Sequence, residues 1–153
     1  MGTTIRANTS KKSKYWISRH RYYELKHFCL QYKEWEVLYL HLDGFAKGDY
    51  TRPPENQMIG DPTAHTSIEK CIYFAKLDMI NRCIESSDLG LAQYLFAGVT
   101  EGRSYEYLKA KLDIPCSRDT YYDRYRKFFW LLDKERGVIR IITSSKFIEF
   151  QSN

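Results

Sequence analysis

The side chains best suited to chemistry lie around a helix break at residues 113–116. Ser104 is expected to cap a short helix over 105–112. This helix ends at the break because Pro115 removes a backbone donor and biases Ile114 away from helix. Ser117 is then expected to cap a longer helix, whose apolar face is predicted at Tyr121, Tyr125, Phe128, Phe129 and Leu132. A short helix, a four-residue turn and a longer helix form the helix-turn-helix pattern, whose second helix places its first turns at base edges in the DNA major groove.

Cationic and hydroxyl side chains gather on both predicted helices of this unit. Guanidinium groups suit guanine edges or phosphates, and lysines or hydroxyls hold backbone phosphates. The residues expected to contact DNA are Ser117, Arg118, Thr120, Tyr121, Arg124 and Lys127 on the second helix, with Lys109 and Lys111 on the first. An ordinary solvated helix face remains the alternative, because such spacing recurs in helical bundles and the charge of residues 100–136 is nearly balanced.

Two stretches of the chain resemble proteins of phage origin. Residues 102–129 (GRSYEYLKAKLDIPCSRDTYYDRYRKFF) resemble the C-terminal unit of small prophage transcription regulators of the RinA/ArpU type, which are similar in turn to region 4 of sigma-70 factors. Residues 14–32 resemble the opening of prophage proteins from Gram-positive hosts. The resemblance implies DNA binding near a phage promoter. By analogy with the family, the residues that recognise the DNA sequence would be Ser117, Arg118, Thr120, Tyr121 and Arg124. The chain departs from the family in its acidic middle and in the residues after Gly137.

The charge is arranged in blocks around a net value of +5. Residues 1–34 carry eight Lys or Arg against two Glu, whereas residues 35–99 carry five basic and nine acidic side chains. Basic ends around an acidic middle indicate an anionic partner, although a solubilising N-terminal tail is the alternative. The cations expected to contact a partner or the DNA backbone are Lys11, Lys12, Lys14, Arg19, Arg21, Arg140 and Lys146. The positive sign argues against acidic mimics of DNA.

Periodicity predicts a mainly α-helical protein with three regions. Residues 1–14 are expected to form a flexible basic arm, residues 15–99 a helical bundle with a loop over 44–62, and residues 100–153 the helix-turn-helix with a β-hairpin. The bundle is expected to be a long antiparallel hairpin of helices 18–44 and 62–85. The first helix has a seam at Leu25, Phe28, Tyr32, Trp35, Tyr39 and Leu42, which packs within the chain or, alternatively, forms a homodimer. The second helix is expected to bury Ile68, Cys71, Ile72, Ala75, Met79 and Cys83.

The end of the chain predicts a β-hairpin. Residues 138–143 and 146–150 alternate like strands on either side of Ser144 and Ser145, and Gly137 is expected to end the preceding helix. A hairpin after a recognition helix is where winged-helix proteins place the wing, which would bring Arg140 or Lys146 to the DNA backbone. Alternatively, the hairpin covers the helix end or pairs with another subunit.

Several classes of function are disfavoured by what the sequence lacks. It has no phosphate-binding loop, nucleophile elbow or zinc-protease run, and its four Cys and four His lack metal-ligand spacing, so we expect no enzyme, cofactor or metal. It also lacks an apolar run long enough for a membrane span and a signal peptide, which favours a cytoplasmic protein of a bacterial host.

Three functions are ranked on these grounds. The first is a phage or prophage DNA-binding transcription regulator with double-stranded DNA as its partner. The second is a phage inhibitor that binds a host defence protein, a protein–RNA complex (as an anti-CRISPR does) or host polymerase. The third is a packaging factor like the small terminase. Arg118 and Arg124 held by neighbouring acids would favour the inhibitor over the regulator.

Overall fold

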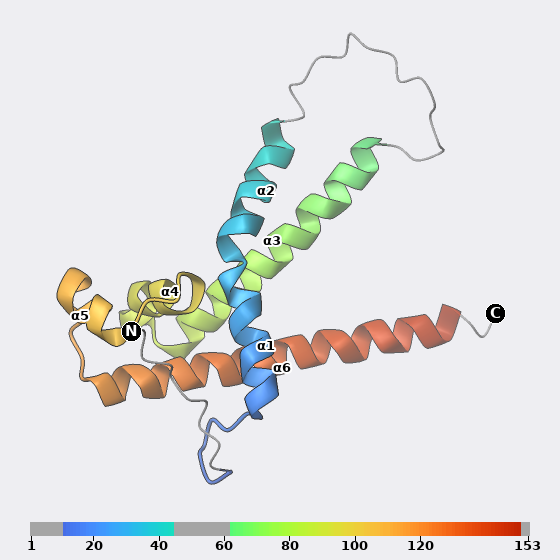
Figure 1. The fold of residues 1–153 in the computed structure, drawn as a ribbon. Coiled ribbons are helices and arrows are strands. Elements are labelled where there is room, and N and C mark those ends of the chain that lie inside the picture. Colours follow the sequence, from blue (N-terminus) through green and yellow to red (C-terminus); the bar gives the residue numbers. More distant parts are fainter. Residues whose placement is uncertain (1–10, 45–61, 151–153) are drawn as a thin grey trace.

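The computed structural model describes residues 11–44 and 62–150, with the backbone alone described at 43, 44, 62 and 138–150. Its elements form a helical structure built along one long helix (Figure 1). They are α1 (Arg19–Leu30), α2 (Tyr32–Gly44), α3 (Pro62–Ser87), the 3-10 helix η2 (Leu89–Leu91), α4 (Ala92–Thr100), α5 (Tyr105–Leu112) and α6 (Arg118–Phe150). In this part of the chain, no helix is both long and apolar enough to cross a membrane.

Local capping groups set the ends of the short helices near α6. The Ser104 hydroxyl accepts a hydrogen bond from the backbone N–H of Tyr107 at 3.3 Å, and Ser117 accepts one from the N–H of Thr120 at 3.3 Å. The Asp88 carboxylate caps η2 by accepting hydrogen bonds from the backbone N–H groups of Gly90 and Leu91. These bonds satisfy donors that a helix N-terminus leaves free, so the predicted start of each helix after Ser104 and Ser117 is confirmed.

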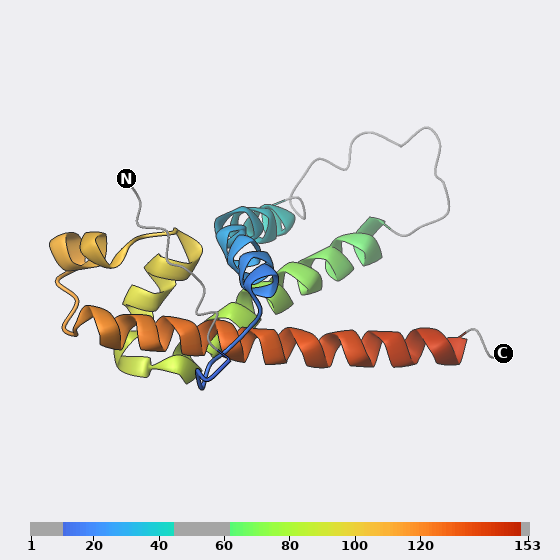
Figure 2. The ribbon, with the colours of Figure 1, turned by 60° about the horizontal axis from the view of Figure 1, so that its bottom comes forward.

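The expected helix over 18–44 is divided at Gln31. The N–H of Gln31 donates a hydrogen bond to the carbonyl of Phe28, three residues back, at 3.3 Å. This bond makes the last turn of α1 a tighter 3-10 turn before α2 begins. The division lets α1 cross α6 while α2 runs antiparallel to α3 (Figures 1 and 2). The predicted seam residues Leu25 and Trp35 are buried by these contacts within the chain.

An aromatic face of α6 forms the centre of the core, as its spacing predicts. Tyr121, Tyr125, Phe128 and Phe129 are each at most 3% exposed. Tyr22 of α1 packs edge-on to Phe129 at 5.0 Å between ring centroids, and its hydroxyl lies 3.3 Å from that of Tyr125. The same hydrophobic cluster contains residues from both sides of residue 100, so the helical bundle and the helix-turn-helix share one core.

The expected β-hairpin is wrong. The described residues contain no β-strand, and α6 continues through Gly137 to Phe150. The Val- and Ile-rich run fits a helix as well as a strand, and adding residues to an existing helix avoids the cost of nucleation. Gly137 is not in the left-handed conformation of a helix stop. There is accordingly no wing to carry Arg140 and Lys146, whose side chains lie outside the described residues.

The predicted buried stripe of α3 is covered over only half its length. Met79 and Cys83 are 6% and 3% exposed, because α3 meets α6 there. Ile68 and Ile72 are 61% and 49% exposed, and Cys71 is exposed as well. The predicted loop lies almost entirely outside the described residues, as does most of the basic arm.

We expect Gly98 of α4 to be required by its contact with Tyr121. A Cβ at Gly98 would lie 2.0 Å from the Tyr121 hydroxyl oxygen, which has no hydrogen-bond partner among the described residues. Gly98→Ala should therefore lower the free energy of unfolding by about 1–3 kcal/mol, although alanine favours helix. Tyr121→Phe removes the clashing, unpaired hydroxyl and should be close to neutral. Urea denaturation of both single variants and the double variant measures these effects.

Rescue is the decisive result of that cycle. In the Tyr121→Phe background, Gly98→Ala should cost much less, because the nearest remaining ring atom is 3.3 Å from the added Cβ. Additive losses in the double variant would show that this contact does not limit the packing of α4 on α6.

Candidate nucleic-acid interface

The helix-turn-helix candidate consists of α5, the turn 113–117 and the first turns of α6. Figure 1 shows α4, α5 and this end of α6 gathered at one end of the molecule. Ile114 is fully buried and anchors the turn. The Tyr105 hydroxyl donates a hydrogen bond to the carbonyl of Cys116 at 2.7 Å, and its ring centroid lies 5.9 Å from that of Tyr121. These contacts fix the start of α6 relative to α5.

The outer surface of this unit carries a small set of exposed polar groups. Ser117, Arg118 and Thr120 are exposed at the start of α6, and the hydroxyls of Ser117 and Thr120 lie 2.9 Å apart. Lys109 and Lys111 are exposed on α5. We call these five residues the cationic head. They are sequence-predicted contacts that the structure brings to one end of the molecule with their side chains accessible.

Among the described residues, Arg118 forms an ion pair with one carboxylate, and its guanidinium lies 5.7 Å from the centroid of the Tyr122 ring. Its guanidinium lies 3.4 Å from the carboxylate of Glu106 on α5, and the two side chains are 50% and 66% exposed. An ion pair this exposed contributes little free energy, so it does not hold Arg118 away from an anionic ligand. Glu106 was not predicted to take part, because it lies twelve residues before Arg118 and only the turn brings them together.

Arg124 and Lys127 instead attach α6 to the end of α3. The Arg124 guanidinium lies 3.2 Å from the carboxylate of Asp88 and 3.3 Å from that of Asp123. The Lys127 ammonium donates a hydrogen bond to the carbonyl of Ser87 at 3.1 Å, where α3 leaves carbonyls without helical partners. Both side chains are partly buried and serve the packing of the helices.

Tyr121 is also taken up by the core. Its side chain is fully buried, and burial raises the pKa of its hydroxyl above the ordinary value. A side chain in this position cannot reach a DNA groove.

The N-terminal cations lie elsewhere along α6. Lys11, Lys12 and Lys14 are exposed, and the Tyr15 ring that follows packs edge-on to Trp130 of α6 with centroids 5.6 Å apart. Twelve helical residues separate Arg118 from Trp130, which corresponds to about 18 Å along α6. These cations therefore lie beside the middle of α6 and not at the cationic head.

The remaining two predicted N-terminal contacts differ from each other. Arg19 is exposed, with its guanidinium 5.8 Å from the centroid of the Tyr23 ring. Arg21 is largely buried and forms ion pairs with Asp133 of α6 at 2.5 Å and with Glu24 at 2.8 Å. Arg21 thus joins α1 to α6 and is not accessible as a contact for a partner.

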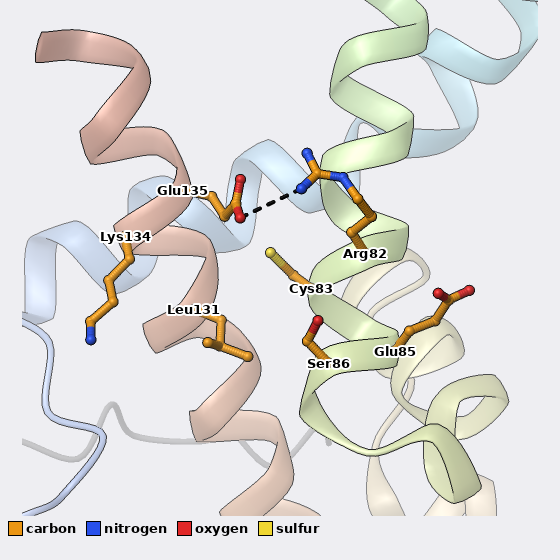
Figure 3. Close-up of a pocket in the computed structure, with 7 residues that line it drawn as sticks. All are labelled: Arg82, Cys83, Glu85, Ser86, Leu131, Lys134 and Glu135. Atoms are coloured by element: carbon orange, nitrogen blue, oxygen red, sulfur yellow. Dashed lines mark ion pairs between the residues drawn. The ribbon is translucent and has the colours of Figure 1, made fainter. Parts of the chain in front are cut away.

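A pocket of about 440 Å³ lies between α3 and α6 (Figure 3). Arg82 and Glu135 form an ion pair of 3.5 Å across it, and Lys134 and Glu85 add one further charge of each sign. Burial raises the pKa of the Cys83 thiol to about 12, which keeps the thiol protonated and unreactive. Mixed charge and an inert thiol give this pocket no evident chemistry.

Metal ligation has no basis in the part of the chain that the structure describes. No group of three or more His, Cys, Asp or Glu side chains there could hold a metal ion.

Comparisons with known proteins found no relative. No protein-family model matches the chain, and neither the search of curated proteins nor that of solved structures gave a match.

Arg124 and Arg118 should differ in how much they contribute to the free energy of unfolding. Arg124→Ala removes a partly buried contact between α6 and the end of α3 and leaves Asp88 without it, so we expect a loss of about 1 kcal/mol in the free energy of unfolding. Arg118→Ala removes only an exposed pair and should change it by less than about 0.5 kcal/mol. Urea titration followed by circular dichroism measures both.

Asp88→Asn is the matched variant, because the amide keeps an oxygen to cap η2 while the charge is lost. Combined with Arg124→Ala it should cost little more than either single change. Equal losses for Arg118→Ala and Arg124→Ala would contradict their different roles.

Proposed function

We propose that the protein binds double-stranded DNA through the cationic head and acts as a regulator of transcription. The observation that carries the proposal is the geometry of α5 and α6. A turn anchored by the buried Ile114 holds the two helices together, while the first turn of the second helix is exposed and carries Arg118. That end of the recognition helix is the part that contacts base edges in helix-turn-helix proteins.

The electrostatics of the cationic head suit a polyanion. Lys109, Lys111 and Arg118 provide three exposed cations, and the N-terminus of α6 adds the positive end of a helix dipole. Arg118 offers two donors to a guanine or a phosphate, and Ser117 and Thr120 offer hydroxyls to phosphates. Lys11, Lys12 and Lys14, beside the middle of α6, supply a second place for backbone contacts. The resemblance of residues 102–129 to prophage regulators supports the assignment to transcription.

The pairing of Arg124 with Asp88 is the main observation against a regulator. It removes one of the two arginines expected to read bases and reduces the contact set to the start of α6. Arg118 is also paired with an acid, Glu106, but both side chains of that pair are at least half exposed, so Arg118 is held less firmly than Arg124. The proposal of DNA binding therefore rests on the exposure of Arg118, while the pairing of Arg124 is what supports the inhibitor alternative.

Binding to a mixed-sequence duplex of about 30 base pairs, followed by fluorescence anisotropy, tests the proposal. Affinity should fall steeply between about 50 and 200 mM salt, because phosphate contacts release counterions. Arg118→Ala should weaken binding about tenfold and reduce the salt slope by about one. Glu106→Gln should strengthen binding severalfold, since it removes a negative charge beside the DNA.

Lys70→Ala is the control, because it removes one positive charge from α3, away from the cationic head. It should bind DNA like the unaltered protein. Absence of binding at low salt, or equal losses for Lys70→Ala and Arg118→Ala, would contradict the proposal.

A further inference from the structure

An apolar stripe on α3 continues from the core into solvent. Ile68, Cys71, Ile72 and Ala75 recur at the spacing of one helix face, in line with Met79 and Cys83, which α6 buries. We call the first four residues the α3 stripe. All four are exposed, with Ile68 and Ile72 at 61% and 49%. A contiguous apolar face of this kind on a surface helix indicates an interaction site.

The end of α6 is the second apolar segment of this kind. Residues 138–150 have the sequence VIRIITSSKFIEF, in which seven of the residues are Val, Ile or Phe. The backbone here is helical, and Figures 1 and 2 both show it extending beyond the other helices. A helix this rich in apolar residues requires a packing partner to be stable in water.

Within one chain, the two segments diverge. α3 and α6 pack together near Met79 and Cys83, and from there the N-terminal half of α3 and the C-terminal half of α6 run apart (Figure 1). At the rise of an α-helix, residues 138–150 span about 20 Å and the α3 stripe spans about 12 Å. The longer segment can therefore cover the whole stripe when the two segments, which diverge within one chain, meet between two chains.

We propose that the protein is a homodimer in which residues 138–150 of each copy pack on the α3 stripe of the other. A two-fold axis makes the contact twice, so both segments of both chains are covered at once. The proposal does not depend on DNA binding and leaves the cationic head of each copy free.

Sedimentation of the full chain without DNA tests this proposal. The unaltered protein should have twice its 18.2 kDa mass at micromolar concentration. The double variant Ile68→Lys with Ile72→Lys should raise the dimer dissociation constant about a hundredfold, because it places charges in the contact. Ile141→Lys with Ile142→Lys should have the same effect through the opposite side of the contact.

Val37→Lys with Leu40→Lys on α2 is the matched control. These side chains are 51% and 61% exposed, close to the values in the α3 stripe, and the dimer should persist when they are changed. Circular dichroism should show the α2 pair with unchanged helical content, and the two dissociating pairs with a loss no larger than the thirteen residues 138–150. A monomeric unaltered protein, dissociation by the α2 pair, or no effect of the pair in α6 would each overturn the proposal.

The reactivity of Cys71 gives a measurement that needs no change in the interface. Cys29 and Cys83 are buried, so in a Cys116→Ser background Cys71 is the thiol that a disulfide reagent reaches. The rate at which the reagent modifies Cys71 should fall as protein concentration rises and the dimer forms. A fast rate that does not change with concentration would overturn it.

Discussion

The burial of the aromatic face of α6 is the interaction on which the rest of the structure depends. Tyr22 from α1 packs against this face, and Tyr105 positions α5 and the turn on it. Gly98 of α4 leaves space for the Tyr121 hydroxyl. Helices from both halves of the chain thus obtain their positions from one surface. The orientation of the start of α6, and with it the exposure of Arg118, is a consequence of this packing.

The same packing divides the charged residues of α6 into two groups. Arg124 and Lys127 face the end of α3, where Asp88 and the carbonyl of Ser87 accept them, and they hold the helices together. Arg118 lies about two turns before them and keeps half of its side chain exposed. Among the residues of this helix that were expected to contact DNA, the exposed ones therefore lie at its start.

Features set by neighbouring residues could be predicted from the sequence, whereas those set by distant residues could not. The caps at Ser104 and Ser117 and the apolar face of α6 depend on contacts within a few positions, and each was predicted. Asp88 lies 36 residues from Arg124, so no local pattern indicated their pairing. The strand prediction for 138–150 failed because a Val- and Ile-rich run has no unique period, and a helix already formed before Gly137 continues through it.

The proposed function requires that DNA contact mainly the cationic head. Backbone amide chemical shifts measured during titration with a short duplex report on each residue of that surface separately. The largest changes should fall on residues 109–120, with smaller changes near Lys14 and almost none on α2. Changes centred on α2 and α3, or no changes at low salt, would contradict the proposed function.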